Sequence, residues 1–319
     1  MKFGINTSPR GLLITREAYF AVAAAAEMHG FDFLSVSDHV VVPRVNASDY
    51  PYSEDAKWGG GASGFALEMW TTIAVLAGST SRLKLLSSVM VVPHRPALLT
   101  AKIISTLDVL SNGRIMVGVG AGWLREEFEA LGARPFDERG KVTDEYIEAM
   151  KELWIDDAPE YGGDHVSFSN VNFLPKPVQK AHPPIWVGGE SMPALRRTVR
   201  LGNFWYPGSG NPKFRLDTPQ RLGERIGRLH ALAEQANRDP ASIGIAYVFF
   251  NPVSFRAEPG FDTPRRMFSG APADLAADVS ALKELGVSHI NLTFGGETLA
   301  EMQHTMQRFA DDVVPLVAS

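Results

Sequence analysis

Three segments of the chain repeat one order of elements: a helical pattern, a glycine and a short apolar run. They read AAEMHGFDFLSVSD, VRLGNFWYP and LKELGVSHINLTF, and their glycines are Gly30, Gly202 and Gly286. A glycine just past a helix end typically adopts the left-handed conformation that terminates the helix. Three such ends, each leading directly into a strand, predict repeated αβ units and a parallel sheet.

Further apolar runs complete a set of predicted strands. The strands lie near residues 3–6, 31–38, 83–92, 114–122, 184–190, 204–208, 243–250 and 289–296, with helical patterns between them. Strands that alternate with helices in this number fit a closed (α/β)8 barrel better than an open sheet. The chain has 319 residues, a common size for such a barrel. We therefore predict one TIM-barrel domain over residues 1–319.

Two intervals are too long to be simple connections. Residues 40–64 are rich in Pro, Tyr and Gly and follow the second predicted strand. Loops of this length are usually lids or binding loops, although exposed tyrosines also suit an oligomer contact. Residues 156–183 contain HVSFSNVNF, whose apolar residues alternate with period two. This alternation predicts a hairpin inserted before the fifth strand, which we interpret as packing decoration.

The composition excludes several classes of protein. Hydrophobic residues make up 45% of the chain and charged residues 21%, as in ordinary soluble globular proteins. There is no cysteine, which excludes disulfides and thiol chemistry, and the net charge of −5 does not support a nucleic-acid surface. The N-terminus lacks the apolar core of a signal peptide, and no run of about 18 apolar residues occurs. We expect a cytoplasmic protein without nucleic-acid or membrane partners.

In an (α/β)8 barrel, chemistry takes place where the strands end and the following loops begin. The second predicted strand ends in Asp38 and His39, and the third passes through Ser88 and Val89. A histidine on this rim predicts a proton-transfer residue. The alternative is a structural imidazole held by Asp38.

The fourth predicted strand carries alternating glycines. Gly118, Gly120 and Gly122 leave one face without side chains, against which a flat ligand could lie. Trp123 follows, and it either stacks on a heterocycle or plugs the barrel mouth. The run is not a dinucleotide fingerprint, because Trp123 stands where that fingerprint needs its third glycine.

The fifth predicted strand leads into the best anion site of the chain, PPIWVGGESMPALRR. Gly188 and Gly189 let the backbone approach a ligand, and Ser191 can cap the following helix, so that free N–H groups point at an anion such as phosphate. Glu190 opposes this reading by adding a carboxylate. The arginines that follow, which either offset that charge or form a solvated face, are Arg196, Arg197 and Arg200.

Other catalytic classes lack their motifs. A serine hydrolase needs a Gly-x-Ser-x-Gly elbow, which does not occur in the chain. A Schiff-base aldolase needs a lysine at the C-terminal end of a strand, but Lys84 begins its predicted strand. No His-Glu-x-x-His or comparable ligand cluster occurs, so we expect no metal site.

Several of these motifs, in this order, resemble the luciferase-like monooxygenase superfamily. The similar stretches are residues 38–53 (DHVVVPRVNASDYPYS), residues 80–132 and residues 175–191 (PKPVQKAHPPIWVGGES). Within the superfamily, the chain most resembles the actinobacterial branch of deazaflavin (coenzyme F420)-dependent oxidoreductases. The resemblance implies an (α/β)8 barrel that binds FMN or F420 across its C-terminal rim. It also implies a non-proline cis peptide in a bulge of the third strand, here Ser88–Val89, that presses on the ring.

The resemblance extends to site residues. Asp38 and His39 occupy the positions of the family's Asp-His pair near the ring and substrate, and residues 188–191 match its phosphate-side Gly-Gly-x-Ser motif. The sugar-phosphate dehydrogenases of the superfamily have a glutamate in place of Trp123 and a tryptophan in the region of Pro43 and Arg44. Glucose 6-phosphate oxidation is therefore not implied.

These arguments predict hydride transfer between bound F420 and a small organic substrate. His39 would donate or accept the accompanying proton, tuned by Asp38. The residues expected to hold the cofactor are Ser88, Val89, Gly122, Trp123, Gly188, Gly189, Glu190 and Ser191. The alternatives are an FMN-dependent monooxygenase that uses reduced flavin and oxygen, and a non-catalytic flavin-binding protein. Both ring systems need the same flat pocket, so the sequence does not separate them. Dimers are common among such relatives, and we expect a homodimer.

Overall fold

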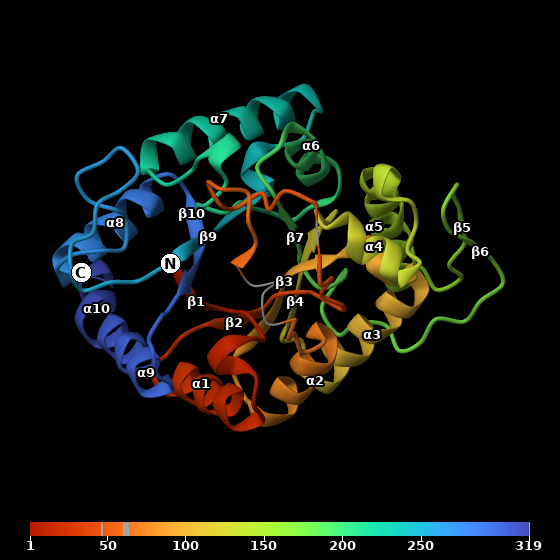
Figure 1. Cartoon of the computed structure of the whole chain (residues 1–319). Coiled ribbons are helices and arrows are strands. Elements are labelled where there is room, and N and C mark those ends of the chain that lie inside the picture. The colour runs from red at the N-terminus through yellow and green to blue at the C-terminus, as the bar shows by residue number, and fades with distance from the viewer. Residues whose placement is uncertain (46, 60–63, 319) are drawn as a thin grey trace.

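Eight parallel strands form a closed barrel in the computed structural model, which describes residues 1–45, 47–59 and 64–318. The order around the barrel is β1-β10-β9-β8-β7-β4-β3-β2, and helices surround it (Figure 1). This is a TIM-barrel fold, and the predicted fold class is confirmed.

Each barrel strand coincides with one of the apolar runs. The strands are β1 (Lys2–Thr7), β2 (Phe33–Val36), β3 (Lys84–Val91), β4 (Ile115–Gly120), β7 (Ile185–Gly188), β8 (Phe204–Tyr206), β9 (Gly244–Pro252) and β10 (Val287–Thr293). All residues of β2 are buried, because one face of the strand packs inside the barrel and the other lies under the helices.

The helices begin at local signals in the sequence. They are α1 (Arg16–Met28), α2 (Met69–Ser79), α3 (Ala97–Leu110), α4 (Arg125–Leu131), α5 (Arg139–Ile155), α6 (Met192–Leu201), α7 (Pro219–Gln235), α8 (Pro272–Glu284), α9 (Leu299–Arg308) and α10 (Val314–Ala318). Hydroxyl side chains accept a backbone N–H at the start of four of them, as N-caps do. These caps are Thr15, Ser191, Thr218 and Thr298. No helix in the described part of the chain is long and apolar enough to cross a membrane.

Two of the three predicted glycine stops are left-handed. Gly30 has a φ of 79° and Gly286 a φ of 84°, as the helix-glycine-strand pattern predicts. The prediction is wrong for Gly202, whose φ of −87° and ψ of 153° are extended. A Cβ on Gly202 would lie 2.8 Å from Cγ2 of Val187, so this glycine is needed for close packing and not for its backbone conformation.

The inside of the barrel is filled by large side chains. The ring centroids of Phe33 and Trp186 are 5.7 Å apart, although their strands, β2 and β7, are not neighbours in the sheet. This contact therefore passes through the barrel interior, where Leu86, Met116 and Tyr206 belong to the same cluster. Because the interior is packed, a ligand site has to lie above this layer, at the strand ends.

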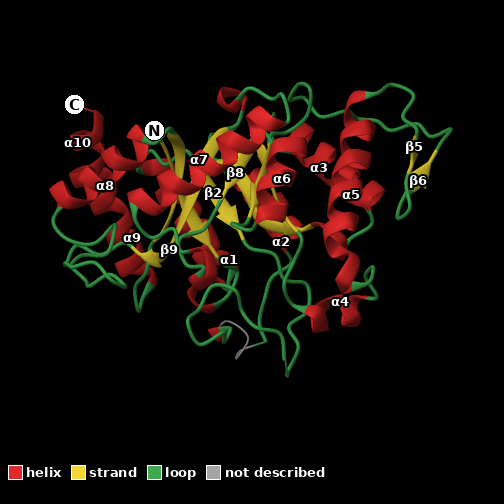
Figure 2. Ribbon diagram, turned by 90° about the horizontal axis from the view of Figure 1, so that it is seen from above, coloured by secondary structure: helices red, strands yellow, loops and turns green. Residues whose placement is uncertain are grey.

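The two long intervals lie at different places. The segment between β2 and α2 contains neither strand nor α-helix in its described part, and residues 46 and 60–63 of it lie outside the described residues. It lies with α4 on the side of the barrel opposite the N-terminus (Figure 2). Within residues 156–183, β5 (Tyr161–Gly162) and β6 (Ser167–Phe168) pair antiparallel and project outside the ring of helices.

Candidate active site

Aromatic side chains from the loop after β2 cover the C-terminal mouth of the barrel. Ring centroids are 5.1 Å apart between Tyr50 and Trp123, and 5.1 Å apart between Tyr52 and Phe250. Trp58 lies 5.6 Å from Trp123. Trp123 follows β4 and Phe250 belongs to β9, so this aromatic cluster joins the loop to distant parts of the rim.

His39 is held by a glutamate from α4. Its Nδ1 lies 2.9 Å from Oε2 of Glu127, and the two side chains are 13% and 1% exposed, respectively. The indole of Trp58 lies at 4.3 Å and 30° from the imidazole. Because a carboxylate only accepts, Nδ1 of His39 donates, and the lone pair of Nε2 is left for proton exchange.

Asp38 has a different partner from the one expected. Its carboxylate accepts two hydrogen bonds of 2.8 Å from the guanidinium of Arg95 and one of 2.9 Å from the Val91 amide. Arg95 also contacts Glu68 at 2.7 Å. The expected tuning of His39 by Asp38 is therefore wrong. Consecutive residues at a strand end point to opposite sides, so Asp38 braces β3 while His39 faces α4.

Sequence reasoning missed Glu127. Its Oε1 accepts from the amides of Val40 at 2.7 Å and Val41 at 3.2 Å, so one carboxyl orients both the His39 ring and the chain leaving β2. The preceding Glu126 accepts from the Ala47 amide at 2.6 Å. The sequence does show a pair of glutamates in the first turn of α4. Acidic residues are common at helix starts, so this pair did not by itself indicate a site residue.

The peptide bond between Ser88 and Val89 is cis, as the family resemblance implies. The pairing of β3 with β4 shifts between Ser87 and Met90, so Ser88 and Val89 form a bulge. Oγ of Ser88 lies 3.0 Å from Oη of Tyr206, which receives a 2.6 Å hydrogen bond from Nδ2 of Asn291. The bulge is thereby tied to the barrel interior.

The glycines of β4 make room for this bulge. A Cβ on Gly118 would lie 2.0 Å from the Ser87 carbonyl oxygen, and one on Gly120 would lie 2.7 Å from Cγ2 of Val89. A Cβ on Gly188 of β7 would lie 3.0 Å from Cγ1 of Val89. The predicted bare strand face is therefore not open to a ligand, because the side chain of Val89 lies against the glycine positions of both β4 and β7 and covers that face.

The end of β4 turns Trp123 away from the glycine strand. Gly122 has a φ of 84°, and a Cβ on it would lie 2.7 Å from both Val91 and Phe128. Trp123 then meets the His39 ring edge-on at 6.4 Å. Of the two alternatives for Trp123, its contacts match a cover over the barrel mouth.

The turn after β7 has the predicted form. Gly189 has a φ of 101°, and Oγ of Ser191 accepts from the Ala194 amide at the start of α6. Glu190 points elsewhere: its carboxyl is buried and accepts 2.8 Å hydrogen bonds from the Gly208 amide and Nδ2 of Asn211. Burial raises the pKa of Glu190. The side chain therefore anchors the loop after β8, and only the backbone of Glu190 belongs to the turn.

The arginines of α6 do not serve this turn. Arg197 and Arg200 both pair with Asp144 of α5, and Arg196 is exposed. The ion pairs of Arg197 and Arg200 hold α6 against α5. A positive charge that neutralises an anionic ligand at the turn therefore has to come from other residues.

Comparison with known proteins decides the family. Residues 1–259 match the model of the luciferase-like monooxygenase family. The chain belongs to this family. The closed sheet and the cis bulge in the third strand of this luciferase-like barrel agree with what the sequence resemblance implied.

Relatives of this luciferase-like chain include an uncharacterized protein and a monooxygenase. An uncharacterized protein of Mycobacterium tuberculosis is 32% identical over 220 residues, which are 69% of this chain and 73% of that protein. An FMNH(2)-dependent dimethylsulfone monooxygenase of Pseudomonas putida is 37% identical over 147 residues, 45% of this chain and 40% of that enzyme. The family and this monooxygenase therefore point to an oxidoreductase.

Solved structures share the fold along the whole chain. Monooxygenase RslO1 from Streptomyces bottropensis superposes with a TM-score of 0.76 at 22% identity, covering 99% of both chains. An F420-dependent secondary alcohol dehydrogenase in complex with an F420-acetone adduct superposes with a TM-score of 0.74 at 18% identity, covering 99% of this chain and 98% of that one.

The mouth of this luciferase-like barrel fits a flavin-type ring with an anionic side chain. Val89 is partly exposed at the mouth, and the glycines Gly120 and Gly188 leave room for its side chain. The Gly189–Ser191 turn opens onto a helix start, a favourable place for a phosphate.

Proposed function

We propose that this protein is an F420-dependent oxidoreductase that transfers a hydride between the bound deazaflavin and a small organic substrate. The observation that carries the proposal is the His39–Glu127 pair, since a hydride moved to or from a carbonyl or alcohol carbon is accompanied by a proton at its oxygen. The shared fold with an F420-dependent alcohol dehydrogenase supports it. When bound, the deazaflavin supplies two-electron hydride chemistry.

The residues of the chain handle the proton. Glu127 accepts from Nδ1 of His39 and so directs Nε2 toward the substrate oxygen, where it gives or takes the proton. Trp58 covers the imidazole and limits its access to water. A low-polarity cover of this kind strengthens the polar contacts beneath it.

The cofactor contacts are proposed from the same geometry. Val89 would press on the face of the ring, with Ser88 held below it by Tyr206. Trp123 and Gly122 would border the ring on the side of β4, and the Gly188–Ser191 turn would hold the phosphate.

The described part of the loop after β2 would cover the substrate. Its tyrosines, Tyr50 and Tyr52, contact rim residues of the same chain, which favours a lid over an oligomer contact. Closure of such a lid excludes water from the reacting groups. A homodimer that uses other surfaces is compatible with this role.

An FMN-dependent monooxygenase is the second candidate, favoured by the 37% identity to the dimethylsulfone monooxygenase. The deciding experiment measures binding of F420 and of FMN to the purified protein, followed by oxygen uptake with the reduced cofactor. F420 binding and hydride transfer without oxygen uptake would support our proposal. Selective FMN binding with oxygen uptake would replace it with the monooxygenase. Binding without turnover over a broad substrate panel would indicate a flavin carrier.

A further inference from the structure

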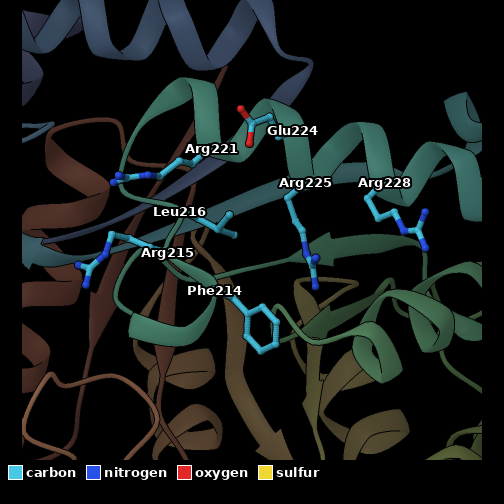
Figure 3. Close-up of a pocket in the computed structure, with 7 residues that line it drawn as sticks. All are labelled: Phe214, Arg215, Leu216, Arg221, Glu224, Arg225 and Arg228. Atoms are coloured by element: carbon cyan, nitrogen blue, oxygen red, sulfur yellow. The ribbon is translucent and has the colours of Figure 1, made fainter. Parts of the chain in front are cut away.

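A cationic pocket lies beside the turn proposed to hold the phosphate. The cavity has a volume of about 420 Å³ and lies between the 3₁₀ turn Pro212–Phe214 and the first half of α7 (Figure 3). Its lining includes four arginines, namely Arg215, Arg221, Arg225 and Arg228. We call it the arginine pocket.

Two of these arginines are already neutralised. Arg215 lies 2.5 Å from a carboxylate oxygen of Glu54, and Arg221 lies 2.7 Å from Asp217 and also pairs with Asp262. These carboxylates neutralise Arg215 and Arg221. The remaining positive charge of the arginine pocket therefore lies on Arg225 and Arg228.

Arg225 and Arg228 form no ion pair with any carboxylate in the described part of the chain. Glu224 lines the same pocket but points to the opposite side of α7 in Figure 3. The Glu190 carboxyl is nearby and is already engaged by the loop after β8. Burial lowers the pKa of Arg225, the Glu190 carboxyl opposes this shift, and the charge of Arg228 adds to it. Two cations thus lie close together with no countercharge of their own.

The arginine pocket is joined directly to the proposed phosphate turn. Nε of Arg225 donates a 3.0 Å hydrogen bond to the backbone oxygen of Glu190, within the turn Gly189–Ser191. The guanidinium also lies 5.1 Å from the ring of Phe214, which fixes its direction. The arginine pocket is therefore within reach of a ligand chain that extends beyond a phosphate at the turn.

We propose that the arginine pocket binds the anionic groups of the cofactor side chain that lie beyond the phosphate. This inference rests on the proposed function. FMN ends at its phosphate, whereas the side chain of F420 continues through a phosphodiester into glutamyl carboxylates. Guanidinium groups form strong charge-assisted hydrogen bonds with such carboxylates. The arginine pocket would then favour F420 over FMN.

The test compares two single-charge variants. Arg228→Gln removes an exposed pocket arginine that has no ion pair in the described structure, so the fold should be unaffected. Arg196→Gln is the matched control, because Arg196 is an exposed arginine on the neighbouring helix α6, outside the pocket. The ligands are F420 and the same deazaflavin without phosphate and glutamates, and the readout is the dissociation constant from deazaflavin fluorescence.

We expect Arg228→Gln to weaken F420 binding by about three- to tenfold, the effect of losing one charge-assisted contact. Binding of the truncated deazaflavin should not change in either variant, and Arg196→Gln should bind F420 like the wild type. Equal F420 affinity in Arg228→Gln and wild type would overturn the proposal. So would a wild-type protein that binds both ligands equally.

A third arm separates the cofactor side chain from a free anion. Inorganic phosphate is titrated calorimetrically into the protein saturated with the truncated deazaflavin. Phosphate binding that depends on Arg228, together with unchanged F420 affinity in the variant, would assign the arginine pocket to a separate anion and overturn our assignment. The assay reads binding alone. A protein that binds F420 through Arg228 but transfers no hydride would therefore refute the proposed function, while the assignment of the arginine pocket would still hold.

Discussion

Glu54 and Arg215 form an ion pair of 2.5 Å that joins loops from opposite sides of the barrel mouth. Glu54 lies in the loop after β2 and Arg215 follows β8, and these two strands stand opposite each other in the closed sheet. Figure 1 shows the loop, in orange, crossing the barrel toward α7. The pair therefore fastens the proposed lid to the arginine pocket.

Glu54→Gln should loosen the lid. The Glu54 side chain is 61% exposed, and exposed pairs contribute about 0.2–1 kcal/mol, so KM should rise by up to about fivefold. Steady-state kinetics checks this. Glu129→Gln, an exposed glutamate on α4, is the control. An unchanged KM would show that the ion pair does not hold the lid.

His39→Ala should reduce kcat by about 10²–10⁴-fold, because it removes the proposed proton donor or acceptor. Its ring packs on Trp58 and faces the mouth, so the dissociation constant of the cofactor should change little. Stopped-flow turnover and cofactor titration on the same sample separate the two effects. A folded variant with the wild-type kcat would make the histidine structural.

Glu127→Gln should change which nitrogen of His39 carries the proton. The amide oxygen can still accept from Val40, but the amide NH₂ then faces Nδ1 and favours the tautomer protonated at Nε2. We expect kcat to fall with little change in KM. The ¹⁵N chemical shifts of the His39 ring report the tautomer directly. A lower kcat with an unchanged tautomer would mean that Glu127 acts only by holding the loop.

Gly189→Val should weaken cofactor binding by more than about tenfold, because a branched side chain at a φ of 101° distorts the turn. Gly286→Val is the matched control, since Gly286 also has a positive φ but precedes β10, at the other end of the barrel. Both variants should lose about 1–2 kcal/mol of stability. Equal cofactor affinity in the two variants would remove the turn from the site.

Glu190→Gln tests the buried carboxyl. Burial raises its pKa above the ordinary value of 4.5, so the stability it contributes is full at lower pH and is lost as the pH rises through the folded-state pKa. A glutamine does not titrate, and its oxygen can still accept from the Gly208 amide. The Tm of the variant relative to wild type should therefore increase from pH 4 to pH 8. A difference in Tm that is constant with pH would show that the carboxyl does not titrate in this range.

The elements of the fold could be read from the sequence because their signals are local. Apolar runs marked every barrel strand, and Ser191 capped its helix where predicted, since capping depends only on residues within one turn. The bulge at Ser88–Val89 has no such local signal and was expected only from the resemblance to the family. A pattern confined to neighbouring residues does not depend on how the barrel closes.

The contacts of the candidate site were decided by the closed barrel. Glu127 lies 88 residues from His39 along the chain, and Arg215 lies 161 residues from Glu54. The sequence marked His39 as a rim residue, but its partner depends on which loops meet above the sheet, and Asp38 was the wrong choice. The alternating glycines of β4 were likewise visible in the sequence, yet only strand packing shows that Val89 occupies the space they leave. Local chemistry determines elements, whereas long-range packing determines which side chains meet.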